Sequence, residues 1–419
     1  MTYSEKMLAA LDQEDINEAQ SQLKQALEND DEDILEELGE TLLSMGFLDE
    51  AKQVFEHLKS RQPEQETMNL PLAEIAVENN ETDLALELLE EVDATSELYP
   101  QALLITADLY QVLGVPEVSE AKLKEAARIL PDESLIQFAL AELYFSMDRL
   151  NEAEFIYQHL LELGEDEINS VSINERLGTT LSLEGDFENA VEYLENSLEE
   201  GQTDERLFQI AFVYRQLQDN DKSIHYLQEL RSLNPQYQAL YLPLAESLQE
   251  EELTEEAQTV AEEGIHENPY SVDLYHFASE NSYRLHDAKK AEDFLLQALE
   301  LGEKTDKTLL TLSNLYLNEE RFEDVIDTIN RMEDPQTPDA LWDLAHAYNE
   351  LEEFEQAAQY YDQASVSLKD EPDFMKEYGI FLREEGRLEE AKSYLSNYLE
   401  YEPGDMEATS ILDDLSERW

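Results

Sequence analysis

The chain has 419 residues, and its 100 Asp and Glu against 27 Lys and Arg give a formal net charge of −73. Hydrophobic residues make up 42% of it, which is enough apolar material for a folded core despite the charge. Because so negative a surface repels phosphate groups, we expect no nucleic-acid partner.

Helix-breaking residues are scarce, since Gly and Pro number only 12 each, and this favours an all-α fold. The lack of Cys excludes disulfides, thiolate nucleophiles and zinc–thiolate sites.

No stretch approaches the roughly 18 to 20 uninterrupted apolar residues of a membrane helix. The first twenty residues, MTYSEKMLAALDQEDINEAQ, also lack a secretory apolar core. We therefore expect a cytoplasmic protein without membrane insertion.

The pentapeptide LPLAE stands at 70–74 and returns at 242–246, a separation of about five periods of 34 residues. We therefore tested that period along the whole chain. With a small residue placed at position 8 of each repeat, the series is Met7, Gly39, Ala73, Ala107, Ala141, Gly178, Ala211, Ala245, Ser279, Ser313, Ala345 and Gly379. Eleven of these twelve residues are Gly, Ala or Ser.

A second small position follows twelve residues later, at position 20. The series there is Ala19, Ala51, Ala85, Ser119, Ala153, Ala190, Ser223, Ala257, Ala291, Val325, Ala357 and Ala391. Small side chains at both positions allow two helices to cross at the roughly 8 to 10 Å of close helix packing. The pattern predicts a row of helical hairpins.

Two segments show the pattern best, LGETLLSMGFLDEAKQVFEHLKSRQP (38–63) and YGIFLREEGRLEEAKSYLSNYLEYEP (378–403). Each ends on a proline, Pro63 or Pro403, just past the second helix. The pattern resembles the tetratricopeptide repeat (TPR) family, although the usual Trp at position 4 is absent. Charge and length are similar to those of acidic multi-TPR proteins of Bacillus-type bacteria.

The resemblance implies a right-handed superhelical solenoid of about twelve helix-turn-helix repeats, continuous over residues 1–404. The repeats are expected to start near residues 1, 32, 66, 100, 134, 171, 204, 238, 272, 306, 338 and 372. The widest spacing, between the fifth and sixth repeats, falls at 163–172 and predicts a loop. Pro71 and Pro243 each occupy position 6, which favours a delayed helix start over a kink.

Residues 405–419 are expected to form a C-terminal capping helix, which a solenoid needs to cover its last stacking face. Asp405 is placed to cap its N-terminus. The apolar stripe of this helix would consist of Ala408, Ile411, Leu412, Leu415 and Trp419.

We find no motif for chemistry in the sequence. The seven His residues are scattered, and no zinc-protease or phosphate-binding motif occurs. Carboxylates are so numerous that close pairs arise by chance. We therefore predict no catalytic residue, no metal site and no cofactor.

The TPR resemblance implies that a partner protein or peptide lies on the concave surface, at positions 2, 5, 9, 12 and 13 of the repeats. Selected mainly from these positions, our candidate partner-binding residues are Glu74, Asp108, Phe138, Glu142, Phe145, Phe208, Phe212, Arg215, Glu246, Tyr283 and Trp342. Carboxylates interleaved with aromatic rings predict a partner of basic and apolar character. Phe138 and Phe208 have an alternative role in packing against the neighbouring repeat.

Our first hypothesis is a non-enzymatic scaffold or adaptor for protein–protein interaction. Two alternatives stay open: a regulator or mimic that occupies a basic nucleic-acid-binding protein, and an unrecognised cation-dependent enzyme. Cationic residues in the later repeats, such as Arg284, Lys376 and Arg383, would instead suit an acidic element. The sequence does not specify the oligomeric state.

Overall fold

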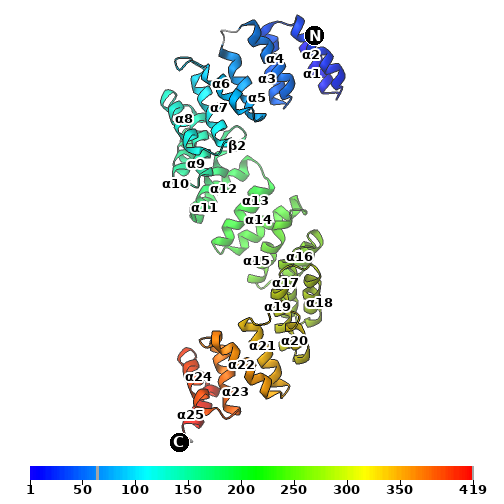
Figure 1. Ribbon diagram of the computed structural model, residues 1–419, viewed down its shortest axis with the longest axis vertical. Coiled ribbons are helices and arrows are strands. Elements are labelled where there is room, and N and C mark those ends of the chain that lie inside the picture. The colour runs from blue at the N-terminus through cyan, green and yellow to red at the C-terminus, as the bar shows by residue number, and fades with distance from the viewer. Residues whose placement is uncertain (63–65, 418–419) are drawn as a thin grey trace. The chain divides into compact units, whose positions relative to one another are not determined.

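A computed structural model of the chain describes residues 1–62 and 66–417. These residues form two compact units, unit 1 (Met1–Leu217) and unit 2 (Gln218–Trp419), which we describe separately. Figure 1 shows the elements in chain order. Pro63 and Trp419, which the sequence analysis singled out, lie outside the described residues.

Unit 1 consists almost entirely of α-helices, with one 3₁₀ turn (Glu66–Met68) and two short strands, β1 (Glu167–Ile168) and β2 (Val171–Ser172). Its helices are α1 (Tyr3–Leu11), α2 (Ile16–Asn29), α3 (Glu32–Ser44), α4 (Leu48–Arg61), α5 (Asn69–Glu78), α6 (Thr82–Glu90), α7 (Tyr99–Val112), α8 (Pro116–Ile129), α9 (Ser134–Ser146), α10 (Leu150–Glu162), α11 (Ile173–Glu184), α12 (Phe187–Glu200) and α13 (Asp204–Gln216).

Unit 2 contains α-helices and one 3₁₀ turn (Gln238–Leu240) in its described part. Its helices are α14 (Asn220–Leu233), α15 (Tyr241–Glu250), α16 (Thr254–Glu267), α17 (Val272–Arg284), α18 (Ala288–Glu300), α19 (Thr305–Asn318), α20 (Phe322–Ile329), α21 (Pro338–Glu350), α22 (Phe354–Leu368), α23 (Pro372–Glu384), α24 (Leu388–Tyr401) and α25 (Met406–Glu417).

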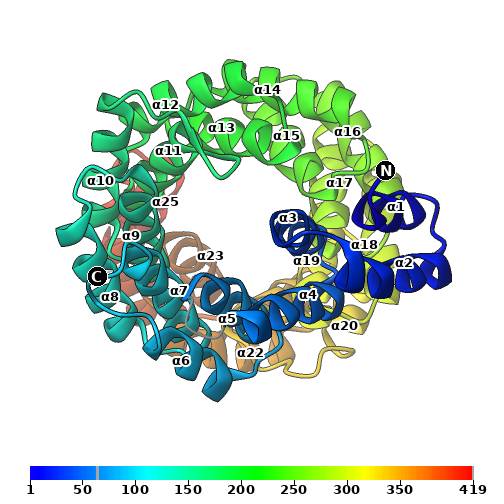
Figure 2. The same ribbon diagram turned by 90° about the horizontal axis from the view of Figure 1, so that it is seen from above.

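Successive helices pack in pairs, from α1 with α2 to α11 with α12 in unit 1 and from α15 with α16 to α23 with α24 in unit 2, which confirms the all-α solenoid of helical hairpins. The helices α13 and α14 belong to different units. The repeat count of twelve and the single continuous array therefore stay predictions. Within unit 2, Figure 2 shows α15, α17 and α19 on the inner side of the curved row and α16, α18 and α20 outside them.

The small residues lie where the helices of a hairpin cross. Every residue of the position 20 series is at most 1% exposed. A Cβ added to Gly178 would lie 2.7 Å from Leu194, and one added to Gly379 would lie 2.9 Å from Leu395. The Ser279 hydroxyl donates a hydrogen bond of 2.9 Å to the carbonyl of Ala291, at position 20 of the same repeat. The predicted close approach at both positions is confirmed.

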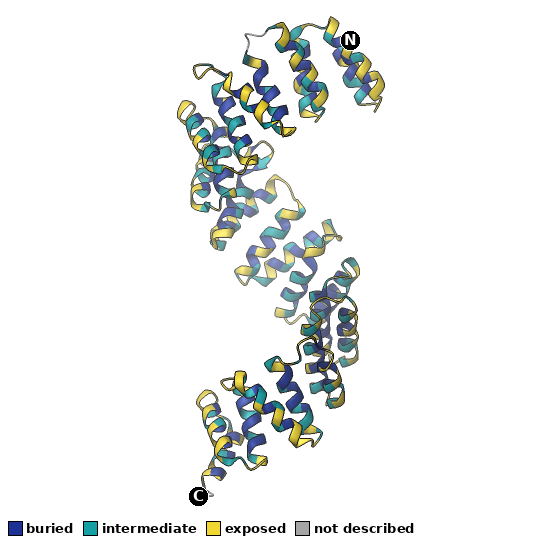
Figure 3. Cartoon of the chain, in the orientation of Figure 1, coloured by how far each residue is buried: buried dark blue, intermediate teal, exposed yellow. Residues whose placement is uncertain are grey.

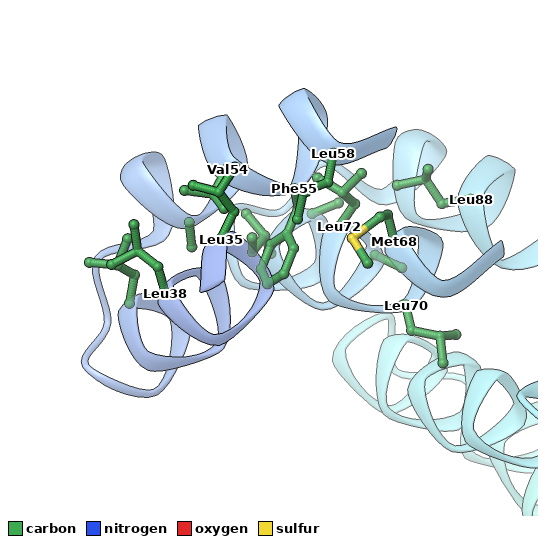
Figure 4. Packing of buried hydrophobic residues seen from close by; sticks show 14 of the residues in the cluster. Leu35, Leu38, Val54, Phe55, Leu58, Met68, Leu70, Leu72 and Leu88 are labelled. Carbon is green, nitrogen blue, oxygen red and sulfur yellow. The ribbon is translucent and has the colours of Figure 1, made fainter. Parts of the chain in front are cut away.

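Larger apolar side chains fill the space within and between hairpins. In Figure 3 the buried residues follow the packed sides of the helices in both units. Figure 4 shows one such cluster in unit 1, where side chains gather between successive helices, among them Leu35, Leu38, Val54, Phe55, Leu58, Met68, Leu70, Leu72 and Leu88. Each hairpin thus shares its core with its neighbours, as expected of repeats that bury no complete core alone.

Pro71 and Pro243 do not interrupt their helices. Each is the third residue of its helix, α5 or α15, and each helix follows a short 3₁₀ turn. The first four N–H groups of a helix have no partner within it, so proline loses no hydrogen bond there. The predicted delayed helix start is confirmed.

The C-terminal helix α25 packs on α24 through Ala408, Ile411 and Leu415, which are at most 7% exposed. Asp405 accepts hydrogen bonds from the backbone N–H groups of Glu407 (2.9 Å) and Ala408 (3.0 Å), which confirms its role as the N-cap.

The segment 163–172 is more ordered than the expected loop. The strands β1 and β2 pair antiparallel, with Glu167 opposite Ser172 and Ile168 opposite Val171. Asn169 and Ser170 between them both have positive φ, at 50° and 62°. A two-residue turn in which both residues are left-handed matches the twist of the two strands that it joins, as is typical of a short β-hairpin.

Left-handed residues mark the turn inside each hairpin of the two units. The series is Glu14, Gly46, Asn80, Gly114, Asp148, Gly185, Glu252, His286, Glu320, Glu352 and Gly386. The turn after α21 shows the geometry, because the N–H of Glu353 donates to the carbonyl of Tyr348 (2.8 Å) and that of Glu352 to Asn349 (3.0 Å). This bonding satisfies the last carbonyls of the helix. Seven of these eleven turns carry a side chain in a conformation that favours Gly.

We predict that Glu352→Gly raises the free energy of unfolding by about 1 kcal/mol, because Glu352 has a φ of 62° and a Cβ there meets the following carbonyl. Chemical denaturation measures the effect. Glu352→Gln removes the same charge without relieving the backbone and serves as the control. Equal stability of the two variants would contradict the prediction.

Candidate partner-binding groove

The inner helices of unit 2 enclose a pocket of about 540 Å³, which we call the α17 pocket. It is lined by residues of α15, α17, α18 and α19: Leu242, Glu246, Asp273, His276, Phe277, Ser279, Glu280, Tyr283, Leu295, Lys307, Thr311, Asn314, Leu315 and Asn318. Most of these residues fall at positions 2, 5, 9, 12 or 13 of their repeats. The first helices of three successive hairpins, α15, α17 and α19, therefore build most of this pocket.

The α17 pocket combines apolar side chains with charged ones. Phe277, Leu295 and Leu315 are at most 8% exposed, so they form a buried apolar base. Asp273 is paired with Lys304 at 2.7 Å, and this hydrogen bond holds its pKa below the usual range. Glu280 makes a solvent-exposed pair with Arg284 at 2.8 Å. Such exposed pairs contribute little to stability, so a ligand can exchange with them.

His276 adds a polar but uncharged group to the same pocket. Its Nε2 lies 2.8 Å from the hydroxyl of Thr308. Burial, followed by the nearby positive charge of Lys307, lowers the pKa of His276 below its usual value. The imidazole is therefore neutral at pH 7 and leaves the charge of the pocket to its carboxylates and to Lys307.

A second pocket, of about 430 Å³, lies between α19, α21 and α23, and we call it the Trp342 pocket. Its lining residues are Leu310, Asn314, Leu317, Asp339, Trp342, Asp343, His346 and Glu377. Asn314 lines both pockets, so the two adjoin along α19. Together they form a groove along the inner face of unit 2.

Asp343 is the most buried acidic group of the groove, at 7% exposure. Its Oδ2 accepts a hydrogen bond of 2.7 Å from the Ser313 hydroxyl. Burial raises the pKa of Asp343 to about 7, against the smaller opposing effect of that hydrogen bond. The carboxyl is therefore about half protonated at neutral pH.

The pKa of the neighbouring acid, Glu377, is shifted in the opposite direction. His346 Nδ1 lies 3.1 Å from its Oε1, and the hydroxyl of Tyr361 donates to the same oxygen at 2.6 Å. Burial alone would raise the pKa of Glu377, but the hydrogen bond from His346 leads the effects that bring it below the usual value. The same bond raises the pKa of His346. His346 and Glu377 thus each stabilise the charged form of the other.

The candidate acids of unit 1 lie on α5, α7 and α9. Burial, together with the charge of Asp108, raises the pKa of Glu74. Asp108 reaches solvent, yet the protein atoms around it on the inner face deprive it of hydration and raise its pKa to about 6. Glu142 is paired with Arg176 at 3.0 Å and accepts a hydrogen bond from Tyr157.

The candidate aromatic residues divide by exposure. Phe138 is only 7% exposed and packs with its ring centroid 6.5 Å from that of Tyr157, which leaves little of its surface for a partner. Phe145 and Phe208 are half-buried. Phe212 is 46% and Tyr283 37% exposed.

The structure brings Glu246 and Tyr283 together in the α17 pocket and places Trp342 in the adjoining one. Arg215 is half-buried on α13, in unit 1. Four lining residues at inner-face positions were not predicted from the sequence: Asp273, His276, Lys307 and Asn314. His276, Lys307 and Asn314 are neither acidic nor purely aromatic, the two residue kinds from which the candidates were mainly chosen, whereas Asp273 fits that choice and was overlooked. Asp343 and Glu377, at position 6, gave no sequence signal.

In the part of the chain that the structure describes, no group of three His, Cys, Asp or Glu side chains is arranged to hold a metal ion. None of the described helices has the length and apolar character to cross a membrane.

The paired helices with small residues at their crossings define a TPR protein, and the comparisons agree. Models of tetratricopeptide repeats match residues 171–200 and 207–237, and a model of the tetratricopeptide repeat protein 21 ARM repeat matches 4–113. YpiA-like tetratricopeptide repeat models match residues 111–165 and 338–405. The TPR repeat-containing protein YpiA of Bacillus subtilis (strain 168) is 34% identical over 357 residues, covering 85% of this chain and 84% of the relative. The chain belongs to the YpiA-like family of tetratricopeptide repeat proteins.

Among solved structures, the C-terminal part of a TPR repeat-containing protein from Cytophaga hutchinsonii is similar with a TM-score of 0.50 and 15% identity. The match covers 58% of this chain and 99% of that one. This similarity supports the fold. The TPR family indicates a protein-interaction scaffold, and its members are generally not enzymes.

We predict that Asp343→Asn stabilises the protein above pH 7 by up to about 4 kcal/mol, from the rise of the Asp343 pKa from 3.8 to about 7. A raised pKa means that the folded state favours the protonated form of Asp343. The stability that this protonated carboxyl contributes is complete below pH 3.8 and is lost as the pH rises through 7. The amide of the Asp343→Asn variant resembles the protonated acid but does not ionise, so the variant keeps that stability.

Denaturation curves from pH 4 to pH 8 measure this difference, with Asp370→Asn in an exposed turn as the control. The Asp343→Asn curve should separate from the wild-type curve as the pH rises. Parallel curves would show that Asp343 does not titrate as its burial requires.

Proposed function

We propose that the protein is a non-enzymatic scaffold that holds a basic, partly apolar segment of a partner protein in the groove of unit 2. The observation that supports this most directly is the α17 pocket, which three successive first helices build over an apolar base. Pockets of this size, mostly apolar with a few polar groups, are typical of ligand sites.

The charge expected of the partner segment follows from the charges around the pocket. Glu246 and Glu280 lie on neighbouring helices, α15 and α17, and a ligand cation can exchange with Arg284 in its exposed pair with Glu280. Lys or Arg side chains of a bound segment would meet the two glutamates. The net charge of −73 would also attract a basic partner before contact and repel an acidic one.

Lys307 would favour one orientation of a bound segment over the other. Among the described residues it makes no ion pair within 4 Å, and it lines the α17 pocket from α19. A segment with its basic side chain towards Glu246 and Glu280 would place a carbonyl or carboxylate near Lys307. This arrangement favours one chain orientation over the reverse.

We further propose that the protein acts in the cytoplasm and on proteins, not on nucleic acid. The charge supports this, because a phosphate backbone would meet repulsion from most of the surface.

Selection from a random peptide display library tests the proposal. Peptides that bind the immobilised protein should combine Lys or Arg with large apolar residues, and their binding should weaken with added salt. The double variant Glu246→Lys/Glu280→Lys should lose at least tenfold in affinity for them. Glu256→Lys, an exposed acid on the outer helix α16, is the matched control.

Two results would contradict the proposal. One is selection of acidic peptides. The other is a loss of binding that is as large with Glu256→Lys as with the double variant, since that would place the binding surface elsewhere.

A further inference from the structure

We propose, as an extension of the scaffold function above and resting on it, that the Trp342 pocket is the anchor site for an arginine side chain of the bound segment. The pocket lies beside the α17 pocket and shares Asn314 with it. A single extended segment can therefore place one side chain in each.

The lining of the Trp342 pocket has the chemistry of a cation site. Three carboxylates reach it, from Asp339 and Asp343 on α21 and from Glu377 on α23, and no Lys or Arg is among the described residues that line it. The basic side chain opposite them is His346, whose Nδ1 already lies 3.1 Å from Glu377 Oε1. Asp339 and Asp343 are thus left to a ligand.

Asp343 is the independent observation that points to a ligand. Its side chain is 93% buried, it lines the pocket, and its Oδ2 hydrogen bond comes from the neutral Ser313. Among the described residues, no cation lies within 4 Å of it. A buried carboxylate without a cation is costly, and a bound cation would remove that cost.

The titratable groups that act on Asp343 are Asp339 and His346 on its own helix and Glu377 on α23. The facing residue of α19 is the uncharged Ser313. Asp339 and Glu377 raise the pKa of Asp343 and His346 lowers it, each by less than burial does. Burial therefore dominates the raised pKa of Asp343, and a ligand cation would lower it again.

Arginine fits better than other cations. Leu310, Leu317 and Trp342 supply apolar and aromatic surface, which suits an organic cation more than a hydrated metal ion. The guanidinium is planar, can bind a carboxylate through two parallel hydrogen bonds and stacks on aromatic rings. The Trp342 ring is held by Phe374, with centroids 5.6 Å apart at 87°, so it offers a fixed surface.

The test uses the full chain at pH 8 and two probes, acetyl-Leu-Arg-Leu-amide and the same peptide with citrulline in place of arginine. Citrulline keeps the shape but carries no charge. The chain contains two Trp residues, so the indole N–H signal of Trp342 can be followed by NMR with that of Trp419 as internal reference. We expect the arginine peptide to shift the Trp342 signal saturably, with an affinity at least tenfold above that of the citrulline peptide.

Variants assign the effect to the pocket. Asp343→Asn should weaken binding of the arginine peptide at least tenfold, while Asp370→Asn should leave it unchanged. Asp343→Asn is expected to be more stable than the wild type at this pH, so loss of binding would not reflect unfolding. Equal affinity for both peptides, no effect of Asp343→Asn, or tighter binding of free spermidine than of the arginine peptide would each overturn the inference.

The two proposals can fail separately. Display-selected peptides that depend on Glu246 and Glu280 but not on Asp343 would overturn the arginine site alone. Absence of any binding that depends on Glu246 and Glu280 would overturn the scaffold proposal.

Discussion

The close approach of two helices within each hairpin is the constraint on which the rest of the structure depends. Gly178 and Gly379 leave space that Leu194 and Leu395 fill, and the hydroxyl of Ser279 reaches the backbone of its partner helix. Bulkier residues at these positions would separate the helices. Because each hairpin has the same narrow crossing, successive first helices align on one side, and the groove of unit 2 is built from them.

Contacts between neighbouring hairpins repeat as well. The Arg149 guanidinium lies 4.2 Å from the ring centroid of Tyr144, and both side chains bind Glu120 of the preceding hairpin, at 2.8 and 3.1 Å. In unit 2, Arg321, Tyr316 and Glu292 repeat this arrangement. Each ion pair alone contributes about 0 to 1 kcal/mol. The repetition matters more, because it joins one hairpin to the next at the same place.

Residue spacing was enough to predict the hairpins, the small residues at the crossings and the inner-face positions. These features depend on the period of the helix, which the sequence records directly. Even Pro71 and Pro243 were interpreted correctly, because a proline is tolerated in the first turn of a helix and costly further along.

Other features depend on neighbours in space and were not accessible from spacing. Phe138 has the same inner-face spacing as a groove residue, yet it packs on Tyr157. The burial of Asp343 requires α19 and α23 on either side of it. The hairpin at 167–172 arises from backbone pairing that the residues Asn169 and Ser170 indicate only weakly. The sequence could therefore predict which repeat positions face the candidate groove, but not which side chains contact one another in it.

A double-mutant cycle at one crossing tests the central claim most directly. Gly178→Ala in the wild type should lower the free energy of unfolding by about 1 to 3 kcal/mol, because the new methyl group would overlap Leu194. In a Leu194→Ala background the same change should be neutral or stabilising by about 0.5 to 1 kcal/mol, since alanine is the better helix former. An equal loss in both backgrounds, or a gain in the wild type, would contradict the account.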